Sequence, residues 1–103
     1  MKMVLISHPE VGAEALARIL LEERLTACIQ ISAPVTSLYR WQGEVVHDRE
    51  VQLWCKTSDG AADALMARIR ALHPYEVPEI LLLPVEGGWE AYHAWVQEEV
   101  RQA

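Results

Sequence analysis

Residues 35 to 57 read VTSLYRWQGEVVHDREVQLWCKT, and this stretch decides the fold. It predicts two β-strands that fold back on each other at Gln42-Gly43, where the glycine is free to take a positive φ in a tight turn. Pro34, directly before the stretch, is typical of an edge strand or a bulge. We interpret the charge cluster Asp48-Arg49-Glu50 in the returning strand as an exposed segment that discourages edge-to-edge aggregation.

Both arms of this hairpin are long for a chain of 103 residues. A domain of about 100 residues has a diameter of roughly 30–35 Å, from a radius of gyration near 13 Å. Straight strands over residues 26–41 and 44–57 would each span roughly 40–50 Å. They must bend or project, and a projecting two-stranded ribbon is marginally stable alone and offers unpaired edges. The chain is therefore expected to form a closed homo-oligomer.

The remaining segments complete a single α+β domain over residues 1–103. Short apolar runs at 3–7 and 79–85 predict buried strands. Helical spacing of apolar residues predicts helices over 11–24, from Ser58 or Asp59 to Leu72, and over 89–100. The order predicts a ferredoxin-like βαββαβ sandwich with a long hairpin between its second and third strands and an extra C-terminal helix.

Composition excludes several classes of function. A net charge of −6 argues against a nucleic-acid partner, which would require a basic face. No apolar run approaches the roughly 18 residues that a membrane span needs, and no signal-peptide pattern opens the chain. Cys28 and Cys55 form no CxxC motif and are expected to be reduced thiols, which favours the cytoplasm. Without GxSxG, GxGxxG or P-loop motifs, we predict no enzymatic activity.

The densest cluster of functional groups is the segment HPYEVPE, residues 73 to 79. One interpretation is a rigid connector, since two prolines fix its dihedral angles. The other is a binding site in which His73, Tyr75 and Glu79 meet Lys56 from the hairpin. A histidine beside carboxylates can bind a divalent ion, and a lysine can hold an anionic ligand or pair with a glutamate. Cys28 is either a small buried hydrophobe or a soft metal ligand.

Four runs carry a family resemblance: RLTACIQI at 24–31, PVTSLYRWQGEV at 34–45, EVQLWCKT at 50–57 and ALHPYEVPEILLLPV at 71–85. They closely resemble the CutA divalent-cation tolerance family, and the similarity extends from Val4 to Val96. The resemblance implies a cytoplasmic protein with a ferredoxin-like fold. It also implies a trimer built through long β-hairpins, similar to PII-type signalling proteins, with a role in tolerance of divalent metals, chiefly copper.

The resemblance also implies candidate site residues. Some members of the family carry proposed copper ligands, a cysteine ending the first strand and a His-His pair before Pro-Tyr. Ser7 and Leu72-His73 stand at those positions here, so only one histidine remains, and a serine hydroxyl binds copper poorly. We expect weak binding of Cu²⁺ or another divalent cation through His73 and Cys28, with no obligatory cofactor. The candidates for a ligand cleft between subunits are Lys56, Tyr75, Glu79, Tyr39 and Trp41.

Two further hypotheses remain beside metal tolerance. A PII-like homotrimer could take a small anionic ligand between subunits as a binding or signalling module, with Lys56 and residues 75–79 lining the cleft. Alternatively, the trimer could serve as a scaffold that anchors a protein partner, whose identity the sequence does not indicate.

Overall fold

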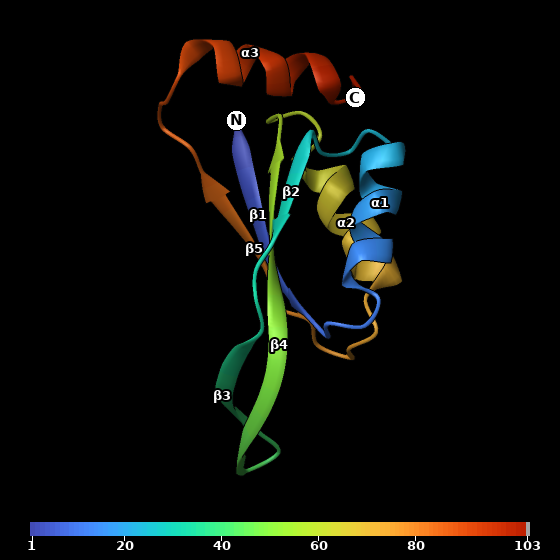
Figure 1. Cartoon of the computed structure of the whole chain (residues 1–103), viewed down its shortest axis with the longest axis vertical. Coiled ribbons are helices and arrows are strands. Elements are labelled where there is room, and N and C mark those ends of the chain that lie inside the picture. Colours follow the sequence, from blue (N-terminus) through green and yellow to red (C-terminus); the bar gives the residue numbers. More distant parts are fainter. Residues whose placement is uncertain (103) are drawn as a thin grey trace.

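The computed structural model describes residues 1–102 and contains five strands and three helices within them (Figure 1). In chain order they are β1 (Lys2–His8), α1 (Ala13–Glu22), β2 (Cys28–Ile31), β3 (Val35–Trp41), β4 (Glu44–Thr57), α2 (Ala62–Leu72), β5 (Ile80–Pro84) and α3 (Glu90–Glu99). This order confirms the α+β prediction of a ferredoxin-like arrangement with an appended helix. The first arm of the hairpin is divided into two strands, β2 and β3, whereas the returning arm is continuous.

The sheet is antiparallel, with the strand order β2-β4-β1-β5, and α1 and α2 pack on one of its faces. Alternation along the strands decides which residues enter the core, because every second side chain faces the helices. The core-facing side chains of β1 and β4 are Val4, Ile6, Val51, Leu53 and Cys55, all buried against the apolar stripes of the two helices. Val51, Leu53 and Cys55 alternate with Gln52 and Trp54, which lie on the opposite face of β4.

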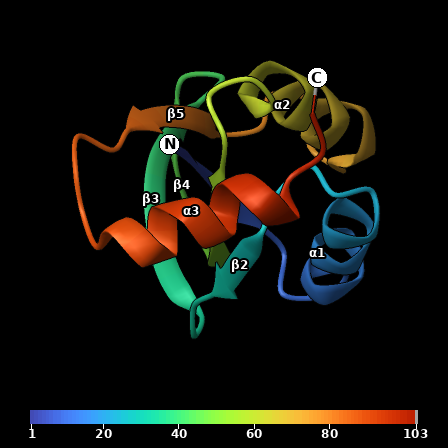
Figure 2. The ribbon, with the colours of Figure 1, turned by 90° about the horizontal axis from the view of Figure 1, so that it is seen from above.

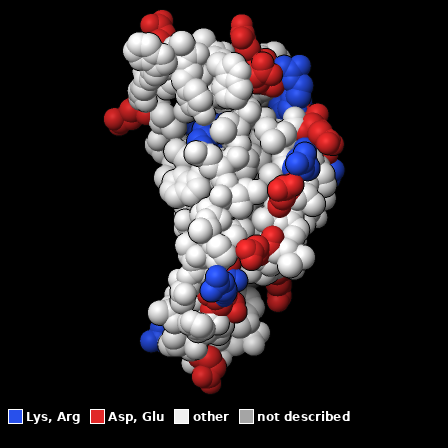
Figure 3. Space-filling model, in the orientation of Figure 1, with Lys and Arg blue, Asp and Glu red and all other residues white. Residues whose placement is uncertain are grey.

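The opposite face of the sheet carries apolar side chains without a helical cover in the part of the chain that the structure describes. Leu5 pairs with Trp54 on one side and Leu81 on the other, so these three side chains form a row across this face. In Figure 3 the left part of the middle region, on the side away from α1 and α2, is almost free of acidic and basic groups. Helix α3 crosses one end of the sheet (Figure 2). There Val96 and Val100 are buried in one cluster with Ala61.

The hairpin of β3 and β4 projects from the body, and the whole chain measures 44 × 25 × 22 Å along its principal axes. Its turn is the predicted one, because Trp41 pairs with Glu44 and the two residues between them, Gln42 and Gly43, both have positive φ. The predicted irregularity at Pro34 is a bulge in which residues 32–34 lie opposite only residues 51 and 52 of β4.

The helix boundaries differ from the prediction where tertiary contacts intervene. Helix α2 begins at Ala62 rather than at Ser58 or Asp59. The Ser58 hydroxyl instead accepts a bond from the backbone N–H of Ala61 within the preceding turn, and Asp59 pairs with the N-terminal amine. Among residues 1–102, none of the helices combines the length and apolar character that spanning a bilayer requires.

Candidate functional site

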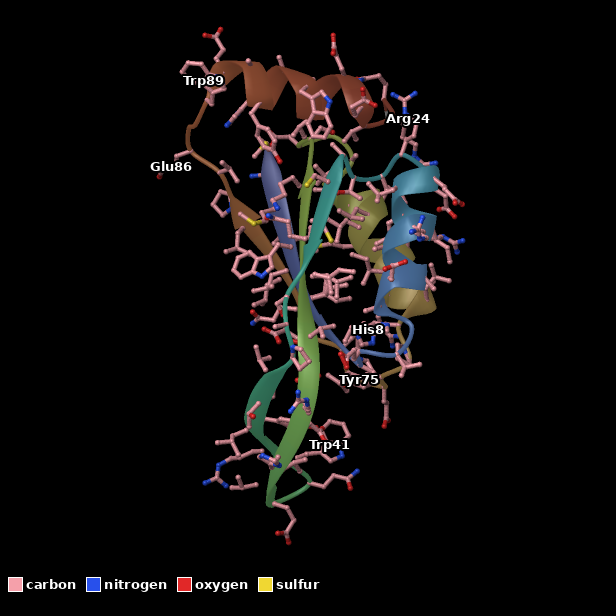
Figure 4. All side chains as sticks on the ribbon, in the orientation of Figure 1. His8, Arg24, Trp41, Tyr75, Glu86 and Trp89 are labelled. Carbon is pink, nitrogen blue, oxygen red and sulfur yellow. The ribbon has the colours of Figure 1, made fainter. Side chains whose placement is uncertain are left out.

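A cavity of about 420 Å³ lies between the hairpin and the loop that follows α2. Figure 4 shows Tyr75 of this loop and Trp41 of the hairpin on the same side of β4, at the end of the body from which the hairpin extends. The residues that line the cavity are Ser7, Tyr39, Trp41, Glu50, Pro74, Tyr75, Glu76, Val77 and Glu79. Four of the five predicted cleft residues, Tyr39, Trp41, Tyr75 and Glu79, are thus brought together within one chain.

The buried imidazole of His73 holds the loop in place. Its Nε2 lies 2.7 Å from the backbone oxygen of Ser7, and its Nδ1 accepts a hydrogen bond of 3.1 Å from the backbone N–H of Tyr75. These partners define a neutral ring protonated on Nε2. Burial lowers the pKa of His73, although the bond to Ser7 opposes the shift. Both nitrogens are therefore engaged, and a metal ion would have to displace one of these bonds.

Tyr75 connects the loop to β4. Its ring lies 4.8 Å from that of His73, and its hydroxyl donates a 2.9 Å hydrogen bond to Oε2 of Glu50. Desolvation and the neighbouring carboxylate of Glu50 raise the pKa of Tyr75, so the phenol remains a proton donor at neutral pH. The interpretation of residues 48–50 as an exposed segment is wrong for Glu50, which is 6% exposed because the loop covers it.

Two further polar pairs shape the cavity. The Ser7 hydroxyl donates a 2.5 Å hydrogen bond to Oε2 of Glu79, which joins the end of β1 to the start of β5. The Tyr39 hydroxyl donates to a carboxylate oxygen of Asp48 across the hairpin, and this bond raises the pKa of Tyr39. Of the two acceptors, Glu79 lines the cavity, whereas Asp48 lies outside its lining.

Lys56 lies elsewhere in the chain. It pairs with Met3 and Cys28, and its Nζ donates to the side chain of Gln30. Ser7 pairs with Gln52, four residues away along β4, so about 13 Å of strand separates Lys56 from the cavity. The expectation that Lys56 faces the loop is wrong within one chain, because strand register places it at the α3 end of the sheet.

The two proposed metal ligands also lie at different ends of the sheet. Cys28 is half-buried at the α3 end and contacts Tyr92, whereas His73 lies beside Ser7. Within residues 1–102, no group of three or more His, Cys, Asp or Glu side chains is arranged to hold a metal ion. His73 and Cys28 therefore do not contribute to one site in the isolated chain.

Sequence reasoning did not include Glu50 and Glu76 among the site residues. The alternation of side chains along β4 could have indicated Glu50, because it places Glu50 with Gln52 and Trp54 on the face that turns away from the core. The charge of its neighbours, Asp48 and Arg49, suggested solvent exposure instead. Glu76 lies between the predicted cleft residues Tyr75 and Glu79, but nothing in the local sequence distinguishes it from an ordinary exposed glutamate.

Comparison with known proteins agrees with this architecture. Residues 2–99 match the family described as CutA1 divalent ion tolerance protein. The divalent-cation tolerance protein CutA of Thermus thermophilus is 49% identical over 98 residues, which cover 94% of this chain and 95% of that protein. The mouse protein CutA is 41% identical over 86 residues, which cover 84% of this chain and 49% of that longer protein.

Solved structures show the same fold. The PII-like protein CutA from Nostoc sp. PCC 7120, in apo form, superimposes with a TM-score of 0.94 at 37% identity and full coverage of both chains. The solved divalent cation tolerance protein from Thermus thermophilus gives a TM-score of 0.92 at 48% identity, covering 98% of this chain and 100% of that one. The Thermus protein is named for tolerance of divalent cations and the Nostoc protein for its likeness to PII, and neither name states a catalysed reaction. The chain described here belongs to the CutA1 divalent ion tolerance family.

Proposed function

We propose that this protein acts in divalent-cation tolerance as a homotrimeric, PII-like ligand-binding module of the cytoplasm. The observation that carries the proposal is the combination of a projecting hairpin with an uncovered apolar sheet face. Leu38 and Val45 are 69% and 67% exposed on the ribbon, and Leu81 is exposed on the sheet. Exposed apolar area of this extent is typical of surfaces that pack against another subunit.

Strand pairing supports the same assembly. Among the described residues β3 pairs with β4 alone, so its second edge presents free backbone donors and acceptors. A neighbouring copy that supplies a strand to this edge would satisfy those groups, and repetition around a three-fold axis would close the ring. The likeness to PII-like CutA structures fits an oligomer of this kind. Placement in the cytoplasm is supported by the two free cysteines, Cys28 and Cys55.

Light scattering on the purified protein tests the assembly. We expect a molar mass of three times the 11.7 kDa chain. The substitution Leu38→Asp places a charge in the proposed interface and should shift the mass toward that of a single chain. Val11→Asp is the matched control, because Val11 is 89% exposed before α1 and lies outside the hairpin. A wild-type protein with the mass of one chain at micromolar concentration would refute the proposal.

Weak Cu²⁺ binding is a second candidate function, favoured by one contact. The ring of His8 lies 4.9 Å from that of His73 in an edge-on arrangement, so a second imidazole is present although Leu72 replaces the preceding histidine. Two imidazoles suit copper, but His73 would have to give up one of its hydrogen bonds, which limits the affinity.

Calorimetry with Cu²⁺ tests this candidate. Wild-type protein, His8→Gln and His73→Gln should be compared, with the exposed hairpin residue His47→Gln as the control and Cys28→Ser as a test of the thiol. If the imidazole pair binds copper, both His8→Gln and His73→Gln weaken binding while His47→Gln does not. Equal affinity in wild type, His8→Gln and His73→Gln rejects the pair as the ligand.

A further inference from the structure

All the charged side chains that line the cavity are acidic. Three carboxylates line it, those of Glu50, Glu76 and Glu79, and none of the described lining residues is basic. The Ser7 hydroxyl is already committed to Glu79. The cavity therefore offers hydrogen-bond acceptors and negative charge, and its three carboxylates would repel an anionic ligand.

Glu50 is the buried member of this set. It is only 6% exposed, and within residues 1–102 its Oε2 has one donor, the hydroxyl of Tyr75, while Oε1 has none. No fully enclosed side-chain oxygen or nitrogen in the described chain lacks a partner, so Oε1 is not sealed in the protein and faces the cavity. A buried carboxylate with a free oxygen is costly unless a donor or a cation reaches it.

The remaining walls are aromatic. Tyr39 and Trp41 from the hairpin and Tyr75 from the loop border the same space. Aromatic faces attract organic cations. The Tyr39 hydroxyl is engaged by Asp48, which does not line the cavity, and the Tyr75 hydroxyl by Glu50, which does. The carboxylates line a cavity of about 420 Å³ but do not converge as a group of three metal ligands among the described residues. Carboxylates spread over a cavity of this volume suit an organic cation better than a bare metal ion.

From these features we propose that the cavity binds a small organic cation, a guanidinium, amidinium or primary ammonium group carried on a flat apolar body. The cationic group donates hydrogen bonds to Glu50 Oε1 and to the carboxylate of Glu79, and the apolar body lies against Trp41 and Tyr39. This inference rests on the ligand-binding role proposed above and names the chemical class of the ligand.

Three compounds of similar shape and different charge test the proposal: benzamidine, benzamide and benzoate. Each is titrated into ¹⁵N-labelled protein in its native assembly, and the Trp41 indole and Tyr75 amide signals are followed by NMR. Benzamidine should shift both signals in a saturable way, whereas benzamide should bind at least about tenfold more weakly because it lacks the charge. Benzoate should leave the signals unchanged.

Glu50→Gln and Glu79→Gln each remove one negative charge from the cavity with little change in shape. Each should weaken benzamidine binding by about tenfold or more. Glu86→Gln is the matched control, because Glu86 lies on the loop before α3, at the opposite end of the molecule from Tyr75 (Figure 4). Its affinity for benzamidine should equal that of the wild type.

Several results would overturn the proposal. These are benzoate binding as tightly as benzamidine, equal benzamidine affinity in wild type and both cavity variants, or no binding of any of the three compounds. The last result is also expected if a side chain of a second copy fills the cavity. Light scattering on the same samples tells the failure of this proposal from the failure of the proposed trimer, because it measures the assembly independently of benzamidine binding. The Glu→Gln changes lie outside the exposed apolar residues of the interface and should leave the molar mass unchanged.

Discussion

The hydroxyl of Tyr75 donates a 2.9 Å hydrogen bond to Oε2 of Glu50, a carboxylate that is almost completely buried. The two residues are 25 positions apart in the sequence, one in the loop after α2 and the other in β4. This bond ties the loop to the hairpin and so holds the two walls of the cavity at a defined separation. The stability of the loop and the shape of the cavity therefore depend on the same contact.

Replacing Tyr75 with Phe should destabilise the protein by about 1–2 kcal/mol, because a bond to a charged and buried acceptor is lost. Urea unfolding followed by tryptophan fluorescence measures this change. All variants must be compared at one protein concentration, since the stability of the proposed oligomer would depend on it. In a double-mutant cycle with Glu50→Gln, the two losses should be less than additive. Strictly additive losses would show that the two side chains are not coupled.

The hairpin turn should respond in opposite directions to substitution at its two central residues. Gln42 has φ of 50° and Gly43 has φ of 83°, and a left-handed conformation is strained for most side chains. Gln42→Asn should stabilise the protein by roughly 0.5 kcal/mol, because Asn tolerates this region better. Gly43→Ala should destabilise it by about 1–2 kcal/mol. A new Cβ at Gly43 would meet no atom within 4 Å, so the loss would come from the backbone alone. Thermal unfolding of both variants checks the prediction, and a loss of stability in Gln42→Asn would contradict it.

The ion pair between α1 and α2 should make stability depend on pH. The single Nε–H of Arg68 is shared between both carboxylate oxygens of Glu23, and Nη2 donates a second hydrogen bond to Oε2. This hydrogen bonding lowers the pKa of Glu23 below its ordinary value of 4.5. A carboxylate with a depressed pKa stabilises the fold fully above its ordinary pKa, and that contribution is lost as the pH falls through the folded-state pKa.

Arg68→Gln should therefore lower the melting temperature at pH 7 and have a diminishing effect as the pH falls below about 4.5. Arg18→Gln is the control, because Arg18 pairs with Glu14 on the exposed surface of a single helix, where ion pairs contribute little. Differential scanning calorimetry from pH 7 downward measures both variants. An Arg68→Gln deficit that persists unchanged at the lowest pH would refute the assignment.

The two thiols should differ in reactivity. Burial raises the pKa of Cys55 to about 12, whereas Cys28 is half-buried on the other face of the sheet. At pH 8 only about one Cys55 side chain in ten thousand would be a thiolate, which is the reactive form. A disulfide reagent that releases a coloured thiol should therefore modify Cys28 first and Cys55 only after unfolding. Rapid modification of Cys55 in a folded Cys28→Ser variant would contradict the buried placement.

Much of the fold could be predicted because the relevant signals are local. The alternation of Val51, Leu53 and Cys55 specifies the core face of β4, and Gln42-Gly43 locates the turn. The helix boundaries were less predictable, since the Ser58 hydroxyl closes a turn ahead of α2 by accepting from Ala61, and Asp59 pairs with the N-terminal amine, which only the tertiary structure brings close.

The candidate site was only partly predictable, because its residues come from distant parts of the chain. Clustering of functional groups in residues 73–79 indicated the loop, but local charge could not reveal that Glu50 is buried beneath it. Within one chain, Lys56 lies away from the loop for a related reason. Its distance from the loop depends on the pairing of Ser7 with Gln52, which no local pattern encodes.

The sequence by itself determined the hairpin and the order of strands and helices. These properties follow from side-chain periodicity and turn chemistry, which act over a few residues. Only the tertiary structure decided that both nitrogens of His73 are occupied and that Glu50 opens into an acidic, aromatic-walled cavity. Those features depend on strand register and on the packing of the loop against β4, and so on contacts between residues far apart in the chain.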